Sequence, residues 1–79
     1  MKFYILSERA VFGNEIKYVS SSKDKVTRAM KNAYGMHSKD CAKVFQFGEL
    51  TIGNPNPNSN DVFITVSIQE VETDTFINR

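Results

Sequence analysis

The sequence lacks tryptophan, and its 79 residues include only one cysteine, one histidine and two prolines. A single cysteine excludes an intramolecular disulfide, and this cysteine usage favours a reducing, cytoplasmic compartment. No segment approaches the roughly 20 consecutive apolar residues that a membrane-spanning helix requires, so we expect no membrane association. The apolar stretch near the N-terminus, residues 3–6, is too short for the core of a signal peptide.

An excess of charge of one sign is also lacking, because ten Lys and Arg residues stand against nine Asp and Glu. The charges are unevenly placed along the chain: residues 17–43 carry a net charge of +5 and residues 44–79 a net charge of −4. The overall balance excludes a wholly acidic mimic of nucleic acid. It permits a basic surface formed by the middle of the chain.

The composition that remains is typical of one small globular domain, which we expect to span residues 1–79. Apolar residues make up 41% of the chain, and six Phe with three Tyr supply side chains for a core. A chain of this length buries only about 60% of its unfolded surface, so the core is expected to be thin.

Two strands are predicted in the first 20 residues. Residues 2–7 are apolar on both faces, and residues 15–20 are rich in β-branched and aromatic side chains. The connection between them has two alternatives. Gly13-Asn14 has the composition of a two-residue turn, whereas a longer loop over residues 8–14 pairs the apolar runs better, and we favour the longer loop.

A helix is predicted over residues 23–34, followed by Gly35 as its C-terminal stop. Ser21 and Asp24 resemble a capping box at its start. Twelve residues are too few for a stable isolated helix, so this one must pack on a sheet. Its apolar stripe follows helical spacing and consists of Val26, Ala29, Met30, Ala33 and Tyr34.

The second half of the chain is predicted to hold further strands. Residues 36–42 are interpreted as a polar connection and residues 43–52 as a strand, with Gly48 at a bulge or at a tight turn that divides it. The bulge would bring four side chains to the core: Phe45, Phe47, Leu50 and Ile52. Residues 54–60 read as a loop.

Residues 61–71 give the clearest strand pattern, because Val62, Ile64, Val66 and Ile68 alternate with polar side chains. The element order is therefore strand–strand–helix–strand–strand. This order predicts an α+β fold in two layers, with a mainly antiparallel sheet of about four strands and one helix.

Two groups of side chains could carry chemistry. His37 and Cys41 are close in sequence, but a structural zinc site needs about four ligands, so we interpret this segment as a polar loop with a half-buried thiol. Glu70, Glu72 and Asp74 are spaced two apart, and we interpret them as charges that keep a sheet edge soluble. No catalytic residue, metal or cofactor is expected.

Three cations of the predicted helix, Lys25, Arg28 and Lys31, fall together opposite its apolar stripe. The simplest interpretation is a solvated basic face, and the functional one is a patch for an acidic partner or a phosphate backbone. A specific interface also needs buried anchors, often aromatic, and the candidates are Tyr18 and Phe76. These five residues are the predicted partner-binding set.

The layout resembles that of small phage-encoded anti-defence proteins, including several anti-CRISPR proteins. The resemblance lies in the start Met1–Leu6, a polar turn, the strand Ile16–Val19, a single helix through Val26 and Met30, and two following strands. It implies stoichiometric binding to a host defence complex in the host cytoplasm, with inhibition by occlusion. It assigns no functional residue.

Two hypotheses follow. The leading one is a non-enzymatic protein-binding module, an inhibitor of a CRISPR-type complex, for which a homodimer is also allowed. The alternative is a small nucleic-acid-binding accessory or regulatory protein that uses the basic helix face. Few exposed aromatic side chains accompany that face, so we expect any nucleic-acid binding to be weak.

Overall fold

A computed structural model describes residues 2–11, 13–56, 58 and 61–72. It confirms the α+β class and a four-stranded antiparallel sheet, but it holds two helices instead of the one predicted. The elements in chain order are β1 (Lys2–Ala10), β2 (Gly13–Ser20), α1 (Lys23–Tyr34), α2 (Ser38–Phe47), β3 (Glu49–Gly53) and β4 (Phe63–Glu72).

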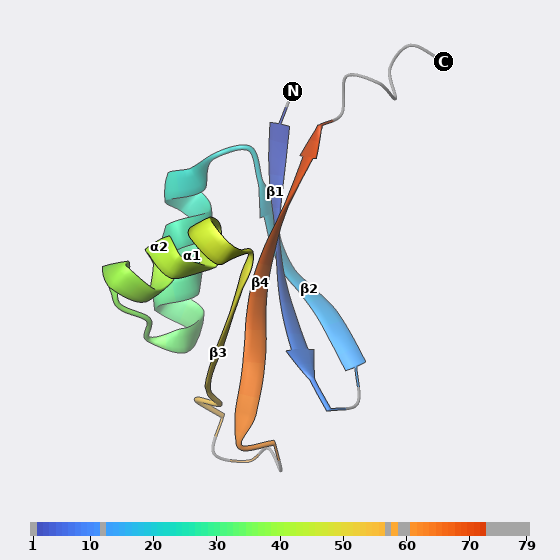
Figure 1. Ribbon diagram of the computed structural model, residues 1–79, viewed down its shortest axis with the longest axis vertical. Coiled ribbons are helices and arrows are strands. Elements are labelled where there is room, and N and C mark those ends of the chain that lie inside the picture. Colours follow the sequence, from blue (N-terminus) through green and yellow to red (C-terminus); the bar gives the residue numbers. More distant parts are fainter. Residues whose placement is uncertain (1, 12, 57, 59–60, 73–79) are drawn as a thin grey trace.

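The four strands form one sheet in the order β2-β1-β4-β3, so the first and last strands of the chain lie side by side at its centre. Both helices cover the same face of this sheet, and among the described residues no helix covers the opposite face (Figure 1). The hydrophobic core lies between the helices and the sheet. Its buried residues are Tyr4, Leu6, Val26, Met30, Met36, Cys41, Val44, Ile64 and Val66.

The β1–β2 hairpin is tighter than predicted. Ala10 pairs with Gly13, so the connection is only residues 11–12, and both predicted alternatives, the loop over 8–14 and the turn at Gly13-Asn14, are wrong. A register shift between Leu6 and Ser7 leaves Lys17 without a partner on β1. Because of this bulge, a hairpin whose turn is as short as residues 11–12 can still pair Ile5 with Val19. A register without the bulge, continued from the Ala10–Gly13 pair, would not bring these two residues together.

Helix α1 begins and ends at the predicted residues. Its N-cap is Ser22 instead of the predicted Ser21, and the Ser22 hydroxyl accepts a 3.3 Å hydrogen bond from the backbone N–H of Lys25. Gly35 has a φ of 64°, in the left-handed region, and its N–H bonds to the carbonyl of Lys31. Glycine adopts this backbone conformation without steric cost, which explains the helix end.

The predicted strand over residues 43–52 is wrong in its first half. Residues 38–47 form α2, because Cys41, Val44 and Phe45 follow the helical spacing i, i+3, i+4 and turn one face to the core. Gly48 is neither a bulge nor a strand turn; it ends α2 with a φ of 87°. Phe47, which the bulge would have buried, is 67% exposed.

Leu50 and Ile52, on the short edge strand β3, are partly buried and pack against the core as predicted. The predicted last strand is confirmed as β4, with Ile64 and Val66 buried and Ile68 partly buried. Val62 lies outside this strand and is 71% exposed, so it is not the core residue that the alternation suggested.

Candidate functional site: the groove between α1 and β2

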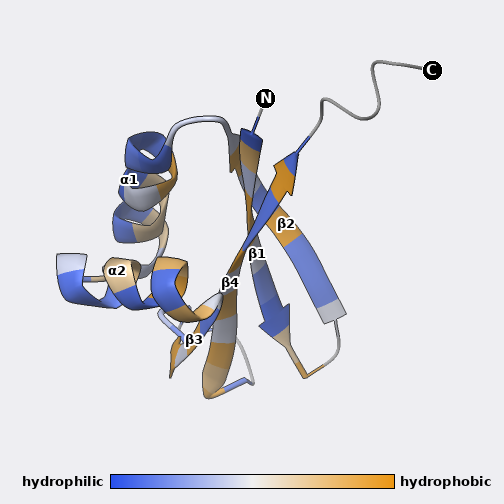
Figure 2. Ribbon diagram, turned by 45° about the horizontal axis from the view of Figure 1, so that its top comes forward, coloured by the Kyte–Doolittle hydropathy of each residue, from blue (hydrophilic) through white to orange (hydrophobic). Residues whose placement is uncertain are grey.

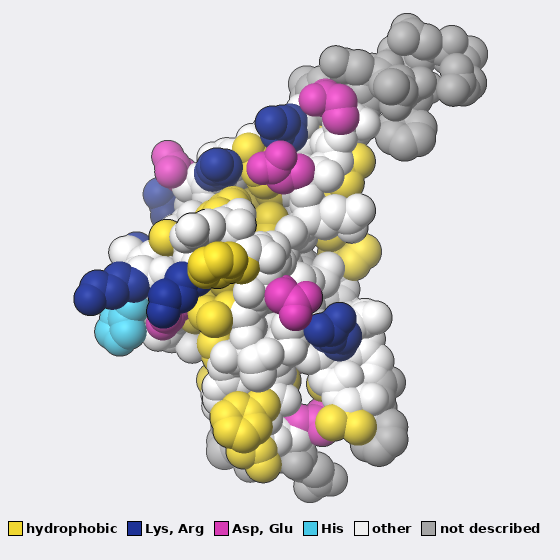
Figure 3. Space-filling view, viewed as in Figure 1, with side chains coloured by type: hydrophobic (Ala, Val, Ile, Leu, Met, Phe, Trp, Pro, Cys, Tyr) yellow, Lys and Arg dark blue, Asp and Glu magenta, His cyan; other side chains and the backbone are white. Residues whose placement is uncertain are grey.

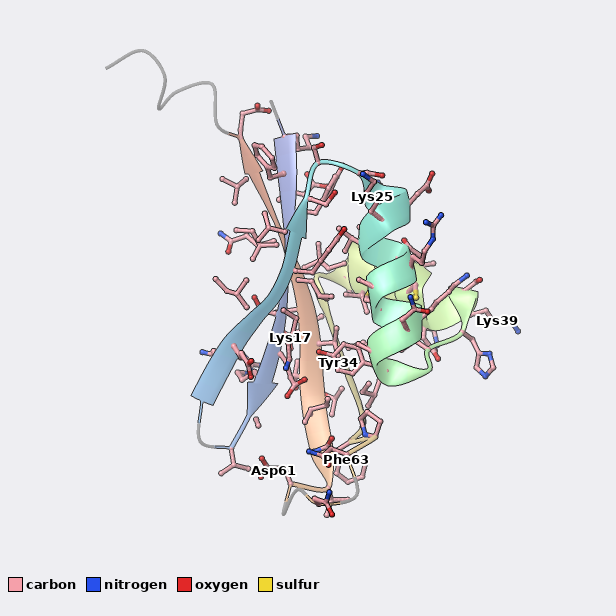
Figure 4. The ribbon with its side chains drawn as sticks, turned by 180° about the vertical axis from the view of Figure 1, so that it is seen from behind. Lys17, Lys25, Tyr34, Lys39, Asp61 and Phe63 are labelled. Atoms are coloured by element: carbon pink, nitrogen blue, oxygen red, sulfur yellow. The ribbon has the colours of Figure 1, made fainter. Side chains whose placement is uncertain are left out.

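Residues of α1 and of the edge strand β2 line two neighbouring hollows on the helical face of the sheet, and we call this region the groove (Figure 4). It holds two hollows, one near the start of α1 and the other near its end. The apolar side of α1 borders both. Ala29 is partly buried and Ala33 exposed, so the predicted apolar stripe is only partly covered by the sheet. Small side chains at these two positions leave space that larger ones would fill.

The first hollow has a volume of about 330 Å³ and brings together three of the predicted partner-binding residues. Tyr18 pairs with the buried Leu6 across β1 and β2, so its ring lies on the helical face of the sheet. Lys25 and Arg28 reach the same hollow from α1, one turn apart. Both are exposed, and Tyr18 is 37% exposed. A basic surface with one accessible aromatic ring results.

The other two predicted residues do not join this hollow. Lys31 lies with Asp24, Thr27 and Arg28 around a neighbouring depression. Phe76 lies outside the described residues. The structure therefore groups Tyr18, Lys25 and Arg28, and it separates Lys31 from Tyr18.

The second hollow, of about 350 Å³, contains a polar cluster that the sequence analysis missed. The Tyr34 hydroxyl donates a 2.9 Å hydrogen bond to Oε1 of Glu8. The Lys17 ammonium lies 4.0 Å from the same carboxylate oxygen and 3.4 Å from Oε2 of Glu15. In Figure 4 the labelled Lys17 and Tyr34 side chains approach each other across the groove.

Burial is the largest cause that raises the pKa of Tyr34 well above its usual value of about 10, followed by the hydrogen bond to the Glu8 carboxylate and by the negative charges of Glu8 and Glu15. Nothing in the sequence signalled this cluster. Glu8 and Tyr34 are 26 residues apart, and Lys17 reaches Glu8 from the bulge in β2.

Charge changes sign along the groove. The hollow near the start of α1 is lined by Lys25 and Arg28, whereas the hollow near its end is lined by Glu8, Lys17 and Asp61. Any long ligand lying in the groove would therefore meet two cations at one end, and at the other end carboxylates that outnumber the single cation Lys17. Chemically, the groove can pair with charged and aromatic groups of a partner surface.

His37 and Cys41 differ in their exposure to solvent. His37 is exposed at the start of α2, whereas Cys41 is a free, buried cysteine whose Sγ faces the carbonyl oxygen of Thr27 at 4.0 Å. Burial raises the pKa of the Cys41 thiol, with the Lys31 charge opposing that shift. The buried thiol is therefore a core side chain, more enclosed than the half-buried one predicted.

Within the described part of the chain, no group of three or more His, Cys, Asp or Glu side chains could hold a metal ion. Of the three acidic residues near the C-terminus, Glu70 lies 3.7 Å from the Lys2 ammonium, and Asp74 is outside the described residues. Among the described residues, neither helix has the length and apolar character needed to cross a membrane.

Comparison with known proteins finds no relative of this chain. No protein-family model, curated protein or solved structure matches this chain significantly. The groove must therefore be interpreted from its own residues.

Proposed function

We propose that this protein is a non-enzymatic binding module that contacts an acidic surface of a protein partner through the groove between α1 and β2. The observation that carries the proposal is the grouping of Tyr18 with Lys25 and Arg28 around one hollow. Tyr and Arg are the residue types that most often dominate binding energy in protein interfaces. The surrounding cations steer an acidic partner and select against basic ones.

Two features favour a protein partner over a nucleic acid. Base stacking needs several exposed aromatic rings, but the groove offers Tyr18, while the Tyr34 hydroxyl is bonded to Glu8. The carboxylates of Glu8 and Glu15 lie on the same side of the sheet and would repel a phosphate backbone, which is negative along its whole length, whereas a protein surface can be acidic at one end of the groove and not at the other. Nucleic-acid binding through the basic face of α1 is the alternative, and we expect it to be weak.

The partner that the resemblance in layout implies is a bacterial defence complex of the CRISPR type, bound stoichiometrically and inhibited by occlusion. In that proposal the protein acts in the cytoplasm of the host. The support that the groove gives to this proposal is its basic hollow with one aromatic ring, which suits an acidic protein patch.

The test compares two charge reversals of equal size. Lys25→Glu with Arg28→Glu changes the hollow, whereas Lys39→Glu with Lys43→Glu alters exposed cations of α2 outside it. Tyr18→Ala removes the proposed anchor. Each variant is used as bait for quantitative capture from a lysate of the bacterial host, beside a melting curve. We expect the first pair and Tyr18→Ala to weaken capture at least tenfold, and the control pair to weaken it less.

Two results would overturn the proposal. One is equal capture by the folded Lys25/Arg28 variant and the unmodified protein. The other is a captured nucleic acid whose affinity falls steeply with salt, as phosphate contacts require. For an acidic protein partner, added salt should mainly slow association.

A further inference from the structure

The sheet face that the helices leave open carries a contiguous apolar cluster. Phe3 of β1 pairs with Val71 of β4, and Ile5 of β1 pairs with Val19 of β2, so all four side chains project from the same face. Val19 is 50% exposed, and the other three are partly exposed. Figure 2 shows hydrophobic stretches on β2 and at the end of β4, and Figure 3 shows hydrophobic side chains at the surface on the side away from the helices.

The same face has no net charge among its described residues. Its two charged side chains are Arg9 of β1 and Glu49 of β3, which lie 3.5 Å apart across β4 and neutralise each other. Between this ion pair and the apolar cluster lie hydroxyl side chains, Ser7 opposite Ser67 on the neighbouring strands. A face with an apolar cluster and no net charge suits a second copy of itself, because identical surfaces with a net charge repel each other when they meet.

The two free edges of the sheet are poorly suited to pairing with another copy. β2 is interrupted by the bulge at Lys17, and β3 has only five residues. Bulges, edge lysines and short edge strands are the devices by which proteins discourage edge-to-edge association. Contact between copies is therefore expected through the face and not through an edge.

We propose that two copies of this chain associate by packing their open sheet faces together around the Phe3, Ile5, Val19 and Val71 cluster. This surface lies on the opposite side of the sheet from the groove, so the proposal does not depend on the binding function of that groove. Four strands of about eight residues present a face of roughly 500 Å² per copy, below the roughly 800 Å² of a standard interface. The dimer should accordingly be weak, with a Kd on the order of 100 µM.

The test measures sedimentation equilibrium of the full chain from about 10 µM to 1 mM. Two variants reduce the apolar area while keeping a β-branched side chain: Ile5→Thr on a central strand and Val19→Thr on β2. Val62→Thr is the matched control, because Val62 is also exposed but lies outside the sheet. We expect the double variant Ile5→Thr, Val19→Thr to raise the dimer Kd by about tenfold or more, and the control to leave it unchanged.

The salt response and the NMR spectrum distinguish this dimer from other assemblies. An apolar, neutral interface should not weaken between 50 and 500 mM NaCl, whereas an electrostatic one should. Backbone amide shifts that change on dilution should centre on Phe3, Ile5, Val19 and Val71.

A monomer at every concentration overturns the proposal and leaves the face to a different protein. Shift changes confined to the β2 edge or to α1, or a dimer unaffected by Ile5→Thr, overturn it equally. Capture of the proposed acidic partner is measured on the same double variant, so loss of the dimer and loss of groove binding are separated.

Discussion

The hydroxyl of Tyr34, in the last turn of α1, donates a 2.9 Å hydrogen bond to Oε1 of Glu8 in β1. This contact joins the end of the helix to a central strand inside the second hollow of the groove. The surrounding core is thin, so a single charge-assisted hydrogen bond is a large part of the attachment there.

Removing this bond should loosen the end of α1. Tyr34→Phe leaves the ring in place but deprives the Glu8 carboxylate of its donor. We expect a loss of about 1–2 kcal/mol in the free energy of unfolding, which for a domain of this size lowers Tm by roughly 5–15 °C. Thermal melting at pH 7 measures it, with Tyr18→Phe as control, since that ring is more exposed. Equal melting temperatures for the Tyr34 variant and the unmodified protein would contradict the prediction.

The Tyr34 bond also predicts a pH dependence. Because the pKa of Tyr34 is raised in the folded protein, folding favours the protonated phenol. Its contribution is fully present below about pH 10, the ordinary tyrosine value, and is lost progressively as the pH rises above it. The Tm difference between unmodified protein and Tyr34→Phe should therefore shrink above pH 10. A difference that stays constant to pH 11.5 would refute this.

Gly48 should tolerate no other residue without cost. Its φ of 87° lies in the left-handed region, and an added Cβ would meet no neighbour within 4 Å, so the penalty is conformational and not steric contact with the rest of the fold. Gly48→Ala should cost about 1 kcal/mol, against little or no loss for Gly53→Ala in β3, where φ is not positive. Urea denaturation of the two variants provides the comparison, and equal midpoints would count against it.

Val26 tests the core beneath α1. Its side chain is fully buried, and the described part of the chain holds no buried polar or charged side chain beside which a new charge could be paired. Val26→Asp should unfold the domain, because it buries an unpaired carboxylate. Lys25→Asp, one residue earlier and exposed, should retain the far-UV circular dichroism of the folded protein. A folded Val26→Asp protein at neutral pH would show that α1 is not anchored there.

The reactivity of the buried Cys41 thiol reports local unfolding of the structure around it. The thiol is 1% exposed and its pKa is raised, so both access and thiolate formation are suppressed in the folded state. We expect its reaction with a disulfide reagent at pH 8 to be at least a hundredfold slower than in urea-unfolded protein. Val44→Ala should accelerate it by loosening α2, whereas Phe47→Ala, at a side chain that is 67% exposed, should not. Rapid labelling of the unmodified folded protein would contradict the burial.

Helix α1 and strand β4 could be predicted from the sequence because their local patterns allow one interpretation. Val26 and Met30 stand one helical turn apart before Gly35, and Ile64 and Val66 alternate with polar residues. Each pattern buries one face of a regular element, and the neighbours do not alter that outcome. Helix α2 was missed because its apolar residues Val44, Phe45 and Phe47 fit a strand with a bulge equally well.

Tertiary packing decided that ambiguity and also the candidate site. Forming α2 buries Cys41 and Val44 against α1 and the sheet, while the strand alternative would have buried Phe47, which now lies exposed. The sequence itself determined that Lys25 and Arg28 share one side of a helix. Only the register that pairs Tyr18 with Leu6 placed an aromatic ring beside them, because the facing of an edge-strand side chain depends on its partner strand and on the bulge at Lys17.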